Sequence, residues 1–420
     1  MKVFITDGNL RSTLAAVRSL GRAGVVVGTG NDTSEMIAGA SKYCREKLIY
    51  PSPVLEPDGF QSFLCEQLAA RGYTHLLAMS DVTVQLVAPL KSRLAPAITA
   101  MVEDAETLLL VQDKAAMLGL AREVNVGTPR YITRGVTCDT GGCDRESLLR
   151  FADSVGYPVV IKPRRSRQYL QGKWSEGSVT YAHTPEELIA KYEAAHRSIP
   201  DPLVQEKLAG EGRGVFLLMW KGEVKAAFCH RRLREKPPWG GVSVLGESLP
   251  IDRALVERSA ALLRAVPWNG PAMVEYKTDA RDGEAKLMEV NGRFWGSLQL
   301  AIDAGIDFPT IYYRLICGED VAAQLEYRAG VKSRWLLGDL DSLITRLRCS
   351  AEQKHLYRSS VSRLRVCADF CHFFGRELHY DVLSASDPKP GWEELKQYIP
   401  LNLRLLLSRQ TPVHAGGTHS

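Results

Sequence analysis

The chain has 420 residues and a formal net charge of +5, with 45% apolar and 24% charged residues. This length exceeds a single ordinary core and predicts two or three domains. The composition is typical of a soluble globular protein, and the small net charge supports neither a nucleic-acid-binding nor a membrane-binding function.

The nine cysteines are odd in number and scattered, which indicates a reducing compartment rather than a disulfide framework. The pair Cys138 and Cys143 and the group Cys367, Cys371 and His372 lack the ligand spacing of a zinc site, so core or loop thiols are favoured. The N-terminus has the pattern of a strand, not of a signal peptide, and no apolar run could span a bilayer. We therefore expect a cytoplasmic protein without nucleic-acid or membrane partners.

Residues 1–112 alternate between strand and helix patterns. Lys2 to Thr6 is β-rich, Leu10 to Arg22 has the apolar spacing of a helix, and His75 to Met79 is a further buried strand. This alternation predicts a Rossmann-like domain with a parallel, doubly wound sheet, in which ligands bind beyond the carboxyl ends of the strands. Five residues lie at those ends: Asp7, Gly8, Asn9, Ser80 and Asp81. No Gly-x-Gly-x-x-Gly follows the first strand, so dinucleotide binding has no support.

Residues 113–325 have an antiparallel α+β pattern. Val159 to Pro163 is an apolar strand that ends near Lys162, which either reaches solvent or meets an anion. Leu203 to Leu208 is another strand, and two further runs, 215–220 and 224–229, pair across a short turn.

The sequence pattern changes after about Gly330 to short amphipathic segments, which predict a mostly helical extension over residues 326–410. Ser384 to Pro390 reads as a turn-rich linker, and residues 411–420 are predicted to be disordered. Within the α+β region, His230 to Ser243 is a candidate mobile loop whose Arg232 and Lys236 could meet an anionic substrate, or could simply be solvated.

The segment from Ala272 to Ser297 predicts a hairpin, because two alternating runs flank Asp282-Gly283. Glu275, Glu289 and Asn291 then share one face, with Glu275 roughly opposite Glu289. Two adjacent carboxylates repel, so a hard divalent cation such as the Mg²⁺ of a nucleotide is a natural partner. A polar face exposed to water is the competing interpretation. The following Gly292 to Ser297 places an arginine, Arg293, beside glycines that let backbone approach a ligand.

The pattern E-x-N-x-R-F-W-G-S, from Glu289 to Ser297, resembles the ATP-grasp ligases, and most closely their carboxylate–amine ligase branch. The resemblance extends over roughly residues 1–320 and implies a two-lobed ATP-grasp domain at 113–325 that follows the Rossmann-like domain. It implies ATP and Mg²⁺, or Mn²⁺ in its place, as cofactors, and a metal site made of Glu275, Glu289 and Asn291.

The same resemblance implies further roles. The nucleotide phosphates would be bound by Lys114 and Lys162. The adenine hinge would be formed by Glu206 and Leu208, in the segment that begins at Gln205. The ribose hydroxyls would donate hydrogen bonds to Glu211. Residues 164–178 take the place of the family's phosphate-covering loop. They include Gly172, Gly177 and Ser178 but also bulky Tyr169 and Trp174, which depart from the glycine-rich form.

The implied reaction joins a carboxylate to an amine through an acyl phosphate and releases ADP and phosphate. Arg293 would stabilise the acyl phosphate, and Lys162 would be a second catalytic residue. The partners would then be small-molecule carboxylate and amine substrates, and the sequence leaves a homo-oligomer open. Two alternatives remain: a biotin-independent or related carboxylase or other acyl-phosphate-forming enzyme, and a non-catalytic ATP-binding module whose helical C-terminal region carries the function.

Overall fold

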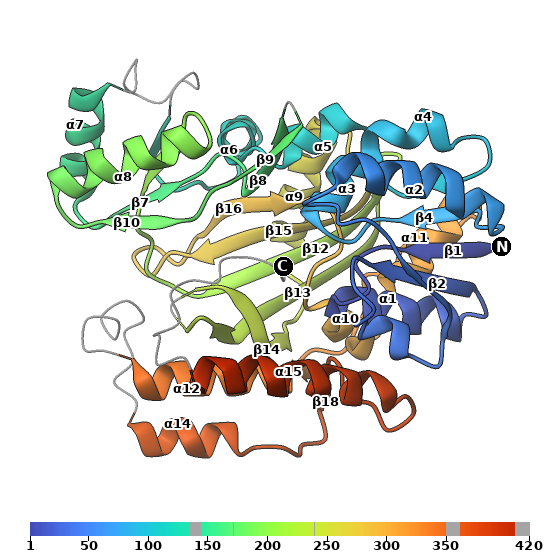
Figure 1. Cartoon of the computed structure of the whole chain (residues 1–420). Coiled ribbons are helices and arrows are strands. Elements are labelled where there is room, and N and C mark those ends of the chain that lie inside the picture. Colours follow the sequence, from blue (N-terminus) through green and yellow to red (C-terminus); the bar gives the residue numbers. More distant parts are fainter. Residues whose placement is uncertain (134–143, 171, 239, 350–361, 408–420) are drawn as a thin grey trace.

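A computed structural model describes residues 1–133, 144–170, 172–238, 240–349 and 362–407, with side chains up to residue 400. Cys138, Cys143 and the tail at 411–420 lie outside these residues. The chain forms a mixed α/β structure with three main sheets and a small hairpin sheet (Figure 1). No helix in the described part of the chain is long and apolar enough to cross a membrane.

The N-terminal sheet is parallel and has the order β3-β2-β1-β4-β5, which confirms the predicted doubly wound arrangement. Its strands are β1 (Lys2–Ile5), β2 (Val26–Asn31), β3 (Cys44–Ile49), β4 (His75–Leu77) and β5 (Thr99–Ala100). Its helices are α1 (Arg11–Arg22), η1 (Ala38–Ala40), α2 (Pro57–Ala70), α3 (Asp81–Val87), η2 (Ala88–Leu90), α4 (Lys91–Leu94) and α5 (Ala105–Val111). Ser80 caps α3 by accepting from the Thr83 N–H, so this helix begins directly at the end of β4.

A smaller lobe follows, with a four-stranded sheet of order β10-β7-β11-β6. Its strands are β6 (Tyr131–Ile132), β7 (Val159–Lys162), β10 (Thr180–Ala182) and β11 (Leu203–Glu206), and its helices are α6 (Lys114–Glu123), α7 (Arg145–Val155) and α8 (Pro185–Ser198). The helices α7 and α8 and the sheet bury a core of their own, separate from the other two cores. A lobe with its own core can shift as a unit relative to its neighbour.

The large sheet has the order β16-β15-β12-β13-β14-β17-β18. Its strands are β12 (Gly212–Trp220), β13 (Glu223–Lys236), β14 (Val242–Ser248), β15 (Gly270–Thr278), β16 (Ala285–Asn291), β17 (Lys332–Arg334) and β18 (Leu378–Tyr380). Its helices are α9 (Arg253–Ala265), α10 (Leu298–Ala304) and α11 (Phe308–Ile316). Two cores run from this sheet into the N-terminal domain: one joins Phe4 to Val274 through α9, and the other joins Leu14 to Phe216 through α10 and α11. This shared packing fixes the N-terminal strand ends against the large sheet.

The C-terminal extension contains α12 (Leu336–Arg348), α14 (Arg363–Phe370) and α15 (Lys389–Leu407), which lie together along one side of the large sheet (Figure 1). It is not wholly helical, because β17 and β18 add two strands to the large sheet. The segment predicted as a linker does form turns, but Asp387 within it is only 2% exposed and accepts from Arg18 Nε of α1 at 2.9 Å. The extension is therefore anchored to both larger units.

Candidate functional site

The acidic hairpin forms as the sequence predicts. Glu275 of β15 is paired with Glu289 of β16 in the antiparallel register, and Met273 is paired with Asn291. Gly283 in the connecting turn has a φ of +76°, a conformation that L side chains rarely adopt. A register shift follows Glu275 directly. Cross-strand pairing therefore places both carboxylates on the same face of the sheet, at the edge nearest the smaller lobe.

Glu289 is held between cations that come from elsewhere in the chain. Lys114 Nζ lies 3.1 Å from its Oε2, and the Asn291 amide donates to its Oε1 at 3.2 Å. Burial favours the protonated carboxyl, but Lys114 and Lys162 outweigh it and hold the pKa of Glu289 at about 2. Glu289 is thus ionised, and ready to ligate a cation, at any physiological pH.

Lys162 and Lys114 converge on this carboxylate from two separate elements. Lys162 ends β7, and burial lowers the pKa of its ammonium to about 8 although Glu289 opposes the shift. Lys114 begins α6, where Asp113 caps the helix, and its Nζ also donates to Ser166 Oγ at 3.1 Å. The sequence Asp113-Lys114 is also common at helix starts where the lysine is solvated, but Lys114 is only 6% exposed and is therefore not solvated in this way. Lys114, which is buried, and Lys162, which is partly buried, thus place two positive charges beside one carboxylate, an arrangement that suits phosphate.

Glu275 has a cationic partner of its own, Arg232 of β13, whose Nη2 lies 2.5 Å from Glu275 Oε2. The same guanidinium contacts Glu235 Oε1 at 3.1 Å. Burial disfavours the charge on Arg232, but the two glutamates outweigh it and raise its pKa. Burial in turn raises the pKa of Glu235, an effect that Arg232 only partly offsets. Arg232 therefore faces the acidic pair.

Arg293 reaches across to the N-terminal domain. Its Nε and Nη2 donate to the two oxygens of Asp81, both at 2.8 Å, and its Nη1 donates to the Phe294 carbonyl at 2.9 Å. The buried guanidinium is 7% exposed, and the pKa of Arg293 is raised because Asp81 outweighs the cost of burial. Its planar fork is thereby fixed beside the strand ends of the N-terminal sheet.

Asp7, at the end of β1, belongs to the same region and has a φ of +58°. Its carboxylate accepts from Thr83 Oγ1 at 2.6 Å and from Ser80 Oγ at 3.0 Å, and burial raises its pKa despite these bonds. Asp7 and Ser80, predicted at the strand ends, are thus brought together. Asn9 instead accepts the Ile37 N–H at 3.3 Å, so it fixes the segment before η1.

The predicted hinge lies in β11 and the residues after it. The buried Glu206 side chain accepts from the Arg130 N–H and from Arg281 Nη2, both at 2.8 Å, and the Glu206 N–H donates to the Arg130 carbonyl at 3.0 Å. The Gln205 Oε1 is buried and has no partner among the described residues. Glu211 lies beside Arg231, 3.4 Å away, where its carboxylate is already partly neutralised. Leu208 is buried at 4% exposure.

Two segments predicted as loops are strands instead. Residues 164–178 contain the hairpin β8 (Arg167–Leu170) and β9 (Lys173–Glu176). The rings of Tyr169 and Trp174 pack with centroids 5.0 Å apart, and Trp174 Nε1 donates to the Pro53 carbonyl at 3.0 Å, so the bulky residues dock this hairpin on the N-terminal domain. The aromatic pair explains why the segment folds into a ladder rather than a flexible glycine loop.

The segment from His230 to Ser243 is likewise not a mobile loop, because β13 runs to Lys236 and β14 begins at Val242. The backbone N–H and C=O groups of this segment bond between the two strands, and only a short turn connects the strands. Of its two candidate cations, Arg232 reaches the acidic pair, whereas Lys236 pairs with Asp341 of α12 and lies 5.3 Å from the Trp335 ring centroid. Lys236 therefore ties the extension to the sheet.

The donor set suits a hard cation. Glu275, Glu289 and Asn291 offer two carboxylates and an amide oxygen on one face, which leaves positions for water and phosphate oxygens. No group of three or more His, Cys, Asp or Glu side chains that could hold a metal occurs in the described part of the chain. The residues fit a metal that arrives with a nucleotide.

Sequence reasoning missed some members of this site. Asp81 was placed at a strand end but not linked to Arg293, and Glu235, Ser166 and Arg281 gave no signal at all. Their partners lie 3 to 212 positions away in the sequence. Arg232 was a candidate from the sequence, but its contact with Glu275 had no local signal.

The comparisons with known proteins agree with this arrangement. The model of a family described as ATP-grasp in the biosynthetic pathway with Ter operon matches residues 198–338, which include the hinge, the acidic hairpin and Arg293. A search of curated proteins finds no match.

Several solved structures share the fold. The biotin carboxylase domain of Hydrogenobacter thermophilus 2-oxoglutarate carboxylase, in complex with MgADP, ADP and bicarbonate, aligns with a TM-score of 0.62 and 16% identity over 79% of this chain and 73% of its own. N5-carboxyaminoimidazole synthetase from Staphylococcus aureus aligns with a TM-score of 0.61 and 12% identity over 83% and 85%. L-Amino acid ligase from Bacillus licheniformis gives 0.55 and 15% over 74% and 73%. The predicted resemblance to ATP-grasp proteins is confirmed, and at these identities the likeness establishes the fold.

Proposed function

We propose that this chain, which has the ATP-grasp fold, is an ATP-dependent ligase that joins a carboxylate to an amine and releases ADP and phosphate. One observation carries the proposal: Lys114, Lys162 and the Glu275–Glu289 pair come from three separate elements and meet at one place. Such a convergence of two lysines and two carboxylates matches the needs of a magnesium–nucleotide complex.

The charges at the site are matched in pairs before any ligand binds. Glu289 is matched by Lys114 and Glu275 by Arg232. A magnesium–nucleotide complex would supply a transferable phosphoryl group and the cation that neutralises it. Glu289 and Glu275 would then exchange their ion pairs with Lys114 and Arg232 for contacts with the metal. Lys114 and Lys162 would bind phosphate oxygens. No buried charge need be left without a partner in either state.

The geometry assigns separate tasks to the chain's own residues. Lys162, whose ammonium is buried, would bind and orient phosphate as a point charge. Arg293, held as a flat fork by Asp81, would align the substrate carboxylate and stabilise the acyl phosphate that it forms. An amine would then displace phosphate to give an amide. Positioning and electrostatics account for this chemistry, so it requires no side-chain nucleophile.

The adenine would bind at the end of β11, between the smaller lobe and the large sheet. The side chain of Glu206 is committed to Arg130 and Arg281, so we assign the contact with the base edge to the backbone of the next residues, which would pair with it as a strand does. The smaller lobe has its own core, so it could close over the nucleotide and exclude water.

The proposal is tested by following ADP release from ATP and Mg²⁺ with a panel of amino acids and other amines and acids, bicarbonate included. We expect ADP to form only when both an acid and an amine are present, with a product mass equal to their sum less water. Turnover with bicarbonate alone would favour a carboxylase. Tight ATP binding without turnover for any pair would contradict the ligase and favour a binding module.

A further inference from the structure

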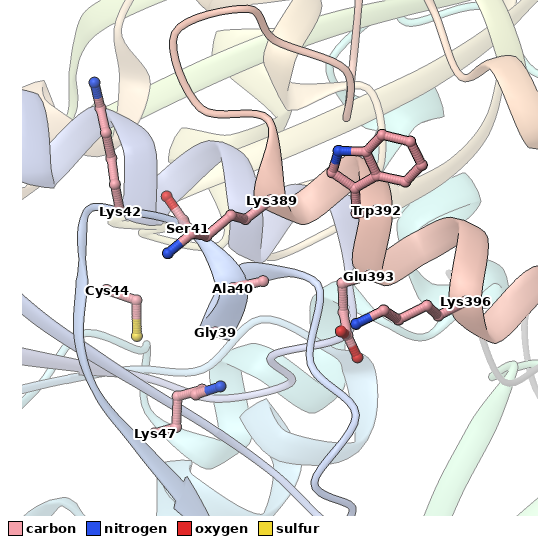
Figure 2. A pocket seen from close by; sticks show the side chains of 10 residues that line it. All are labelled: Gly39, Ala40, Ser41, Lys42, Cys44, Lys47, Lys389, Trp392, Glu393 and Lys396. Atoms are coloured by element: carbon pink, nitrogen blue, oxygen red, sulfur yellow. The ribbon is translucent and has the colours of Figure 1, made fainter.

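A second hollow lies far from the acidic hairpin, between the N-terminal domain and the C-terminal helix. Its volume is about 440 Å³, and its walls come from η1 and β3 on one side and from α15 on the other (Figure 2). Ten residues line it: Gly39, Ala40, Ser41, Lys42, Cys44, Lys47, Lys389, Trp392, Glu393 and Lys396. Small-molecule sites usually measure about 300–1,000 Å³, so this hollow is large enough for a metabolite.

The lining is strongly basic. It contains four lysines and a single carboxylate, Glu393, which accepts a weak hydrogen bond from Gln397 at 3.4 Å. Among the described residues none of the four ammonium groups forms an ion pair; Lys42 alone has an interaction, with its Nζ 5.1 Å from the Tyr43 ring centroid. Lysines elsewhere in the same domain are matched, as in Lys2 with Glu46 and Lys91 with Asp104.

The two walls of the hollow are joined by hydrogen bonds to one buried carboxylate, that of Asp387. Asp387 accepts from the Lys42 N–H at 2.9 Å and from Ser41 Oγ at 2.7 Å, while it is also bound by Arg18. The carboxylate that could have neutralised a lysine ammonium is thus used to join the two walls. Lys47 of the first wall and Lys389 of the second both line the hollow, so an anion bound in it would meet positive charge from both walls.

An aromatic ring completes the lining. Trp392 is 65% exposed, which is unusual for so large an apolar side chain, and it lines the α15 side of the hollow together with Lys389 (Figure 2). An exposed indole at the mouth of a basic hollow can stack on a planar ring, and lysines bind phosphate as point charges. We propose that this hollow is a second ligand site, for a small phosphate ester that carries a planar ring, of the nucleotide class.

The site is independent of the proposed ligase reaction, so its test must separate it from the catalytic nucleotide site. Titration calorimetry with ADP and with pyrophosphate is carried out on a protein with Lys114→Met and Lys162→Met, at near-physiological salt. We expect ADP binding to persist in this background, because none of the hollow's lysines is changed. Absence of binding to this folded background would overturn the proposal.

The lysines are tested in the same background with Lys47→Gln, Lys389→Gln and Lys396→Gln combined. We expect ADP affinity to fall by about tenfold or more. The matched control removes three exposed cations outside the hollow, through Arg45→Gln, Arg93→Gln and Arg253→Gln. An equal loss in the control would mean non-specific attraction and would contradict a defined site.

The ring is tested by Trp392→Ala. We expect ADP to bind more tightly than pyrophosphate, and this variant to remove the difference while leaving pyrophosphate binding unchanged. ADP that binds no more tightly than pyrophosphate would rule out the nucleotide class. If the variant with Lys114→Met and Lys162→Met does not fold, tryptophan fluorescence of the protein with an intact catalytic site replaces calorimetry. A change in fluorescence on addition of ADP that is lost in Trp392→Phe supports the site. A change that is the same in Trp392→Phe refutes it.

Discussion

Arg293 and Asp81, 212 positions apart in the sequence, form a bidentate ion pair with both distances at 2.8 Å. The pair joins the end of the acidic hairpin to the first turn of α3. It sets the direction of the guanidinium that we assign to the substrate acid. Asp81 is therefore a positioning residue, which acts through Arg293.

Replacing Asp81 with asparagine keeps the shape of this contact but removes its charge. Hydrogen bonds to charged groups contribute about 1.5–3 kcal/mol, so kcat/KM for the acid should fall roughly 10–100-fold. The KM for ATP should stay nearly unchanged, and Asp81→Glu should restore part of the activity. Asp58→Asn, which removes an exposed aspartate in the first turn of α2, serves as the control. Steady-state kinetics in which KM for both substrates rises equally would argue against this role.

Replacing Glu289 with alanine should abolish turnover, because it removes a predicted metal ligand and leaves Lys114 and Lys162 without a carboxylate between them. Glu275→Gln should act in the same direction. The control is Glu284→Gln, on the exposed turn of the same hairpin. The measurement is ADP release over a range of Mg²⁺ concentrations. Substantial activity in Glu289→Ala would refute the metal assignment.

The affinity for ATP should depend on pH through Lys162. Its ammonium has a pKa of about 8 because it is buried, so it is charged below pH 8 and loses its proton as the pH rises through that value. The KM for ATP should therefore increase above pH 8. A bound phosphate stabilises the charged form, so kcat should change less. A Lys162→Met variant should bind ATP weakly at every pH, and a rise in KM that survives in this variant would assign the effect to another group.

The stability of the fold should depend on pH through Glu394, which accepts from Trp335 Nε1 at 2.6 Å. Burial raises the pKa of this carboxyl from 4.5 to about 7, although the bond to Trp335 opposes the shift. Its stabilising contribution is fully present below pH 4.5 and is lost as the pH rises through 7, at a cost of at most about 3 kcal/mol.

Glu394→Gln keeps an acceptor for Trp335 and removes this titration. The variant should unfold at a higher temperature than the parent protein above pH 7, with little difference below pH 4.5. Thermal unfolding followed by circular dichroism measures both. A difference of the same size at the two pH values would show that Glu394 acts through packing and not through its charge.

The parts of this protein that depend on local periodicity could be predicted from the amino-acid sequence. The alternation around Asp282-Gly283 predicted the pairing of Glu275 with Glu289, because the period of a strand and the length of a turn fix a hairpin register. Strand–helix alternation likewise predicted the parallel N-terminal sheet.

Which charged side chains meet could not be predicted from the sequence, because it depends on the packing of the elements. Nothing local links Lys114 to Glu289, Arg232 to Glu275 or Asp81 to Arg293, because each contact depends on how separate elements pack. The two segments expected as loops form hairpins, β8–β9 and the end of β13 with β14, and their tertiary contacts, such as the bond from Trp174 to the Pro53 carbonyl, are not visible in the local pattern. Periodicity is a property of neighbours in sequence, whereas a binding site is made by neighbours in space.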